Sequence, residues 1–132
     1  MPPEAFAALP ALVKGLFYDD AARSRCLALL EDGAGRVDRA ALRAAACRNA
    51  LDAVVGDWRL RDVARETLVI ARAGLASQEH AARAAGGLID PEAAEALGLL
   101  EAIVAGERPP FWAALGARWA ASPTLAGIAD PA

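Results

Sequence analysis

The chain has 132 residues, a length that fits one folded domain with a single core. Its net charge of −3 and pI near 5.1 give no basic footprint for nucleic acid, so a nucleic-acid-binding role is disfavoured. No uncharged run approaches the roughly 18 apolar residues that a membrane-spanning helix needs, and much of the 56% hydrophobic content is alanine, which favours closely packed helices.

Two short helices are predicted near the N-terminus. The first covers residues 10–17, because a proline is acceptable in the first helical turn, where its missing N–H would be unpaired. Asp19 or Asp20 then caps a second helix that ends near Glu31. Residues 1–8 are interpreted as a lead-in to a single helical domain over residues 9–121.

A third predicted helix is rich in arginine and alanine. Asp38 is its expected cap, and it reaches about Ala50. Gly56 separates it from the next element, and no segment of the chain shows a convincing strand pattern.

Residues 57–75 form the best-specified predicted helix and the expected centre of the fold. Seven of its residues fall in one stripe of about 160° on a helical wheel, and the charges that follow Asp57 lie outside the stripe. These residues are Leu60, Val63, Ala64, Thr67, Leu68, Ile70 and Ala71. Asp57 is the predicted N-cap, and Gly74 is predicted just past the end, where a left-handed conformation suits glycine. Leu75 would then pack against Ile70 in a Schellman motif.

Three further helices are predicted toward the C-terminus. A short polar one covers residues 77–85, and a second begins at the strong start signal Asp90-Pro91-Glu92 and stops at Gly106. A last one, residues 110–121, carries four large apolar residues: Phe111, Trp112, Leu115 and Trp119. Residues 122–132 are predicted to be a loosely held tail.

The sequence therefore predicts an all-α fold, a compact bundle of about six or seven short helices around the central one. The core candidates are the large apolar residues of the predicted inner faces: Leu16, Phe17, Leu27, Leu30, Leu60, Val63, Leu68, Ile70, Leu100, Ile103, Trp112 and Leu115.

Few residues are candidates for chemistry. His80 is the one histidine and would lack partners for a metal site, so we interpret it as exposed and idle. The carboxylates of Asp19 and Asp20 could bind Mg²⁺, but a helix cap is the simpler interpretation. Thr67 is expected to hydrogen-bond back to its own helix. We therefore predict no catalytic, cofactor-binding or metal-binding residue in this chain.

The two cysteines and the N-terminus indicate a cytoplasmic protein. Cys26 and Cys47 lack C-x-x-C spacing and are interpreted as small buried apolar groups in a reducing compartment, although a disulfide between helices stays open. The N-terminal residues lack the basic and apolar regions of a signal peptide.

Three blocks of the sequence resemble the C-terminal region of plant and proteobacterial glutamate–cysteine ligases. The matching residues of the first block, LPALVKGLFYDD, are Leu9, Pro10, Ala11, Gly15, Leu16, Tyr18 and Asp19. Val13 and Lys14 depart from the family pattern, which has Trp and then Val there. The matching residues of the central helix are Leu60, Ala64, Ala71, Gly74 and Leu75. Residues 99–115 resemble the family's penultimate helix, glycine turn and proline-started last helix.

This resemblance implies the helical C-terminal part of an enzyme that forms γ-glutamylcysteine for glutathione biosynthesis. The complete family enzyme uses ATP and Mg²⁺, and it places their ligands mainly on an upstream sheet that nothing here replaces. The expected partner is therefore a catalytic ligase portion, and an exposed apolar face is expected where that portion would pack. The alternative is a stand-alone helical interaction module or homodimer, which uses Trp58, Val69 or the Phe111–Trp119 face. In either case no nucleic acid or membrane is expected as a partner.

Overall fold

A computed structural model describes residues 3–110, except 35 and 36, together with residue 113. The elements in chain order are α1 (Pro3–Phe17), α2 (Asp20–Ala34), α3 (Arg39–Asn49), the 3-10 helix η1 (Ala50–Asp52), β1 (Val54–Val55), β2 (Trp58–Arg59), α4 (Leu60–Ala84) and α5 (Pro91–Ala105). The all-α prediction is confirmed, with five α-helices in the described part of the chain. The predicted last helix lies outside the described residues, apart from Pro110 and Ala113.

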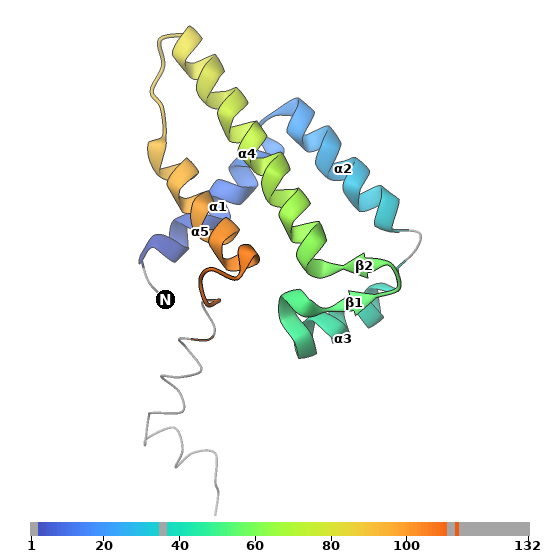
Figure 1. Ribbon diagram of the computed structural model, residues 1–132. Coiled ribbons are helices and arrows are strands. Elements are labelled where there is room, and N and C mark those ends of the chain that lie inside the picture. The colour runs from blue at the N-terminus through green and yellow to red at the C-terminus, as the bar shows by residue number, and fades with distance from the viewer. Residues whose placement is uncertain (1–2, 35–36, 111–112, 114–132) are drawn as a thin grey trace, which may run out of the picture.

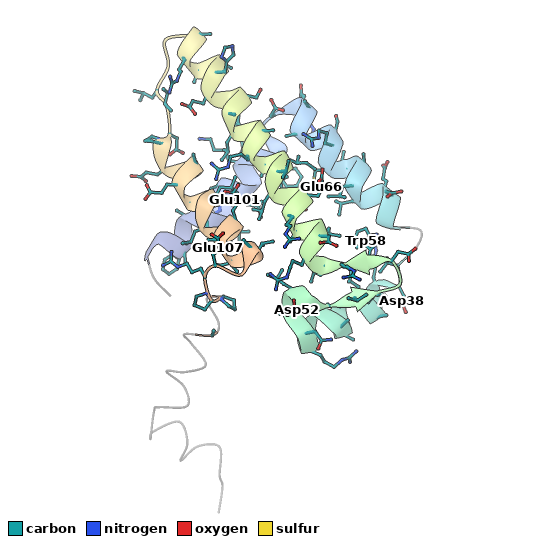
Figure 2. All side chains as sticks on the ribbon, viewed as in Figure 1. Asp38, Asp52, Trp58, Glu66, Glu101 and Glu107 are labelled. Carbon is teal, nitrogen blue, oxygen red and sulfur yellow. The ribbon has the colours of Figure 1, made fainter. Side chains whose placement is uncertain are left out.

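The long helix α4 is the centre of the bundle, as predicted. Helices α1 and α5 pack against each other and against α4, while α2 packs against α4 and α1. Figure 1 shows α2 and α5 on opposite sides of α4, with α3, η1 and the hairpin gathered at the first turn of α4. A bidentate ion pair, in which Arg72 donates to Glu101 at 2.8 and 2.6 Å, joins α4 to α5 (Figure 2).

The bounds predicted for the central helix were wrong at both ends. Asp57 lies in the turn of the β1–β2 hairpin, and Arg59 precedes the helix without a side-chain cap bond. Gly74 and Leu75 are buried within α4, which continues to Ala84, so the separate helix predicted for residues 77–85 does not exist. Gly74 has a packing role instead of ending the helix.

Helices α1 and α4 cross at backbone contact because each has a glycine there. A Cβ built on Gly74 would lie 1.9 Å from the carbonyl oxygen of Gly15. A Cβ built on Gly15 would lie 2.4 Å from the carbonyl oxygen of Ala71. No side chain fits between the two backbones at this point, so both glycines are required by the crossing itself.

Helix α1 begins earlier than predicted. It starts at Pro3, so most of the lead-in predicted for residues 1–8 is helical, and Pro10 lies inside the helix. Pro10 is exposed, whereas Ala5 and Ala8 are buried, because small residues face the bundle along this turn. The burial of these alanines explains why the helix extends through residues that sequence reasoning left outside it.

The remaining helix ends follow the predicted signals. Asp38 accepts a hydrogen bond from the backbone N–H of Ala40 at 2.9 Å and caps α3. Asp90 accepts one from Ala93 at 3.2 Å and caps α5, which ends at Gly106 with a φ of 82°. Helix α2 runs beyond Glu31 to Ala34.

A two-residue hairpin replaces the simple break predicted at Gly56. Val54 pairs with Arg59, and Val55 pairs with Trp58, in antiparallel register. Gly56 has a φ of +57°, a conformation that glycine adopts without strain at the first position of a tight hairpin turn. The hairpin places Trp58 against the end of α2.

The core confirms part of the predicted set. Leu16, Leu68, Ile70 and Ile103 are buried, while Leu60, Val63 and Leu100 are half-buried. Leu97 and several alanines complete the core. Phe17, Leu27 and Leu30 are about half exposed, so their assignment to the core was wrong, and Trp112 and Leu115 lie outside the described residues. None of the described helices combines the length and apolar composition that crossing a lipid bilayer requires.

Candidate functional site

The carboxylates of Asp19 and Asp20 serve the fold. Asp19 accepts a hydrogen bond from the backbone N–H of Ala22 at 2.8 Å, so it caps α2. A hydrogen bond from Ser77 of α4, followed by the bond from Ala22, holds the pKa of Asp19 below its usual range. Asp20 pairs with Arg23 at 2.7 Å. The capping interpretation is therefore confirmed.

The other single candidates lie apart from one another. His80 is exposed on α4, and the hydroxyl of Thr67 donates to the carbonyl oxygen of Val63 at 2.8 Å, as predicted. Cys26 is buried, but Cys47 is exposed, because it lies on the side of α3 opposite the buried Ala45. Both thiols are free. The interpretation of Cys47 as a buried group was therefore wrong.

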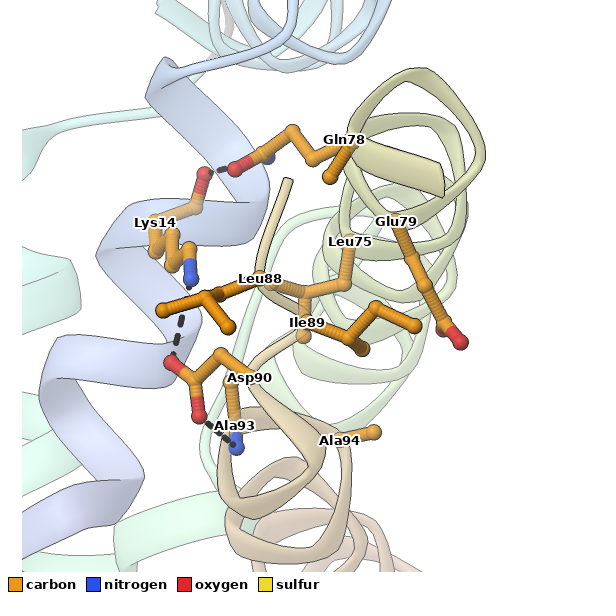
Figure 3. A pocket seen from close by; sticks show the side chains of 10 residues that line it. Lys14, Leu75, Gln78, Glu79, Leu88, Ile89, Asp90, Ala93 and Ala94 are labelled. Carbon is orange, nitrogen blue, oxygen red and sulfur yellow. Dashed lines mark hydrogen bonds and ion pairs between the residues drawn. The ribbon is translucent and has the colours of Figure 1, made fainter. Parts of the chain in front are cut away.

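A cavity of about 250 Å³ lies between α1, α4 and the start of α5, and Figure 3 shows its lining. Lys14 pairs with Asp90 at 3.0 Å, and Asp90 also caps α5. Gln78 donates to the carbonyl oxygens of Lys14 and Gly74 at 2.9 and 3.1 Å. Glu79 pairs with Arg83. Lys14, Asp90 and Gln78 join α1 to the start of α5 and to α4, and Glu79 is paired within α4. The cavity therefore does not assemble a set of groups poised for acid–base or nucleophilic chemistry.

Within the described part of the chain, no three His, Cys, Asp or Glu side chains converge in a way that could hold a metal ion. A second cavity, of about 440 Å³, lies between η1 and the end of α5. There Arg61 pairs with Asp52 at 2.9 Å and also donates to the carbonyl oxygen of Val104, which satisfies the end of α5 (Figure 2). This arginine too has a structural role.

An apolar concave surface lies around Trp58, and we call it the Trp58 groove. Its volume is about 390 Å³, and it is lined by Leu27, Leu30, Glu31, Gly33, Val37, Arg39, Leu42 and Trp58. Figure 2 places Trp58 between the end of α2 and the hairpin. A Cβ built on Gly33 would lie 1.5 Å from the Trp58 ring, so the indole rests directly on the α2 backbone. Leu27 and Leu30 are 49% and 51% exposed in this groove.

The composition of the Trp58 groove suits protein recognition better than catalysis. Tryptophan and arginine are enriched among residues that dominate the energy of protein interfaces. The charged lining residues, Glu31 and Arg39, come from α2 and α3 and leave an apolar floor between them. Sequence reasoning named Trp58 as a possible contact but placed Leu27 and Leu30 in the core. The signal it lacked was that α2 turns Ala22 and Cys26 toward α4, which leaves the two leucines at the edge.

A second apolar surface is the outer side of α1, which we call the α1 stripe. It comprises Phe6, Leu9, Val13 and Phe17, which are 64%, 64%, 41% and 46% exposed. The opposite side of α1, with Ala8, Ala11 and Gly15, is buried in the bundle. Helix α1 is therefore apolar on both sides, and only one side is covered by the described residues.

Comparisons of the chain with protein-family models, with curated proteins and with solved structures find no match. The residues of the chain itself therefore carry the functional argument. Several residues of the ligase resemblance meet in space: Gly15 of the first block contacts Ala71 and Gly74 of the second at the crossing of α1 and α4. Asp19 of the first block caps α2. In this chain these residues hold helices together.

Proposed function

We propose that this chain is a non-catalytic helical unit that binds another protein through the Trp58 groove, and that the partner is the catalytic portion of a glutamate–cysteine ligase. The observation that carries the proposal is the groove itself, an apolar surface with a tryptophan and two half-exposed leucines. Apolar surface of this kind is a common mark of a protein interaction site. ATP and Mg²⁺ would bind the partner, and the complex would act in the cytoplasm.

The assignment of the partner depends on the ligase resemblance. Four of its matching residues lie where they shape the helical unit: Gly15, Ala71 and Gly74 at the α1–α4 crossing, and Asp19 at the α2 cap. Leu9 and Tyr18, which also match, are exposed. The polar groups of the cavities hold the chain's own helices, which favours a role without catalysis. A homodimer through the same groove is the competing outcome.

The test is ATP turnover with glutamate and cysteine. It is measured with the chain alone and with the chain mixed with an upstream ligase-like polypeptide from the same organism. We expect turnover in the mixture alone, accompanied by a complex in sedimentation experiments. Turnover by the chain alone would contradict a non-catalytic role, and a concentration-dependent dimer without turnover in the mixture would favour the homodimer.

Variants of the groove make the test specific. Leu30→Asp places a charge on the groove, whereas Val69→Asp places the same charge on an exposed position of α4 that does not line it. We expect Leu30→Asp to abolish the complex and Val69→Asp to preserve it. Equal binding by the two variants would show that the partner uses another surface.

A further inference from the structure

Every exposed side chain that the structure describes on α1 is apolar. These residues are Phe6, Ala7, Leu9, Pro10, Val13 and Phe17, and they include the whole α1 stripe. Lys14, the charged residue among the described side chains of this helix, pairs with Asp90 at the start of α5 at 3.0 Å. In Figure 1, α1 crosses behind α5 and α4, helices that it packs against, so the stripe faces away from them. The stripe is therefore an apolar surface without a charge of its own.

The order of side chains along the α1 stripe is similar in both directions. An aromatic residue stands at each end, Phe6 and Phe17, and an aliphatic residue stands at each inner position, Leu9 and Val13. When a second α1 runs antiparallel to the first, Phe6 lies opposite Phe17 of the second copy, and Leu9 lies opposite its Val13. Both pairs are centred near residues 11 and 12, so one two-fold axis satisfies them together. A surface that complements itself in this way is what a symmetric dimer requires.

The width and the area of the surface suit such a contact. The four side chains of the α1 stripe fall within about 80° of one another on a helical wheel, the narrow width of a seam between two helices. Phe6 and Leu9 are each 64% exposed. With about 200 Å² for a whole aromatic residue, the exposed parts of the six apolar residues amount to about 500 Å² per chain. Two copies then bury about 1,000 Å², the lower limit for a specific interface, which corresponds to weak, micromolar association.

A second copy fits the α1 stripe better than a lipid surface or an unrelated protein. Helices that lie on a membrane are rich in Lys and Arg beside their apolar face. On the described part of α1 that border has Lys14 alone, which is paired with Asp90, and the whole chain has a net charge of −3. The stripe also lacks the charges by which an interface selects a different protein.

We propose that the α1 stripe is the contact of a symmetric dimer, in which the α1 helices of two copies of this chain pack antiparallel. Phe6 of each copy contacts Phe17 of the other, and Leu9 contacts Val13. The Trp58 groove is lined by residues outside α1, so each copy keeps its groove for another partner. The inference is independent of the proposed function, because it concerns a different face of the bundle.

Sedimentation of the full chain over the micromolar concentration range tests the dimer, with two exposed valines as a matched pair. Val13 lies in the α1 stripe and Val69 lies on α4, and they are 41% and 56% exposed. We expect Val13→Asp to weaken self-association about 100-fold, because the two-fold axis brings two carboxylates into one apolar contact. Val69→Asp is expected to leave association unchanged. Circular dichroism and the Tm of dilute protein show whether both variants are folded.

Two results of this experiment would overturn the proposal. The first is a monomer at every concentration; if this monomer sediments with anionic phospholipid vesicles and Val13→Asp does not, the stripe serves a lipid surface instead. The second is a dimer that Val13→Asp leaves intact and that Leu30→Asp or Val69→Asp dissociates, because the contact then lies in the Trp58 groove or on α4.

Cysteine cross-linking tests the antiparallel orientation without the Val13→Asp variant. Phe6→Cys and Phe17→Cys are made in separate chains that also carry Cys47→Ser, so that the remaining native thiol is the buried Cys26. Mild oxidation of the mixed chains is expected to form a disulfide between them. The two copies of position 6 lie about 16 Å apart in an antiparallel pair, so Phe6→Cys alone is expected to stay reduced. A yield of covalent dimer that is no greater in the mixture than with Phe6→Cys alone would contradict the proposal.

Discussion

The carbonyl oxygen of Gly15 lies 1.9 Å from the position that a Cβ on Gly74 would occupy. Two helices that are distant in sequence therefore meet with no side chain between them, near the middle of the bundle. Helix α1 packs along α4 and α5, so this contact sets how closely three helices approach. The geometry of the crossing makes a direct prediction for each glycine.

Gly74→Ala is expected to destabilise the fold by about 1–3 kcal/mol or more, because the added methyl group meets backbone atoms that cannot rotate away. Gly98→Ala is the matched control, since Gly98 also lies within a helix but its Cβ would have nothing closer than 3.8 Å. This control is expected to gain about 0.5–1 kcal/mol from the lower flexibility of the unfolded chain. Urea unfolding of both variants measures the difference, and destabilisation of both alike would contradict the close crossing.

The Asp90 carboxylate is expected to make stability depend on pH. The hydrogen bond from Lys14 is the main cause that lowers its pKa, and the capped N–H of Ala93 adds to it. A lowered folded-state pKa contributes stability above the unfolded value, about 3.9, and this contribution is lost as the pH falls through the folded-state pKa. Asp90→Asn, which keeps a capping oxygen, is therefore expected to be less stable than the wild type at pH 7 and equal to it in acid.

Asp90→Ala separates the cap from the ion pair. Loss of the capping oxygen is expected to cost about 1 kcal/mol at every pH, in addition to the small effect of the exposed pair. Thermal unfolding at pH 7 and at pH 2.5 would compare the three proteins. A gap between the wild type and Asp90→Asn that stays constant over this range would contradict the role given to Lys14.

Arg61 is expected to matter more than its surface position suggests. It joins Asp52 of η1 to the last turn of α5 and is less exposed than Arg65, which pairs with Asp62 within one helix. We expect Arg61→Met to cost about 1 kcal/mol, since it leaves the carbonyl of Val104 without this donor. Arg65→Met is the control and is expected to change stability by less than about 0.5 kcal/mol. Chemical denaturation with matched buffers distinguishes the two, and equal values would argue against the bridge.

Leucines of the core and of the Trp58 groove are expected to respond differently to truncation. Leu97 is fully buried, so Leu97→Ala should cost about 2–5 kcal/mol. Leu27 and Leu30 are half exposed, and each change to Ala should cost less than about 1 kcal/mol in the isolated chain. A large loss for Leu30→Ala in equilibrium unfolding would mean that this leucine is covered by the protein itself.

Signals that act over a few residues were readable from the sequence. The caps at Asp38 and Asp90 and the left-handed Gly106 follow from hydrogen bonds between neighbours in the chain. The amphipathic stripe of the central helix likewise predicted its buried Leu68 and Ile70. These features need no knowledge of what packs against them.

Long-range packing explains the errors. A glycine in a helical sequence can mark the end of the helix or a place where another backbone packs closely, and the neighbouring residues do not distinguish the two. At Gly74 the second role depends on Gly15, 59 positions away in the sequence. The scarcity of polar clusters in the sequence led us to predict no catalytic residue. The position of the Trp58 groove, by contrast, could not be predicted from the sequence. Its walls come from α2, α3 and the hairpin, whose packing no local pattern reveals.

The two free thiols differ in how readily a reagent can reach them. Cys47 stands exposed on α3, whereas Cys26 is 6% exposed among the side chains that join α2 to α4. A thiol reagent should therefore modify Cys47 at once and Cys26 only when α2 separates from the bundle. The rate of the second modification therefore reports how often the packing of α2 against α4 opens, either locally or when the whole chain unfolds.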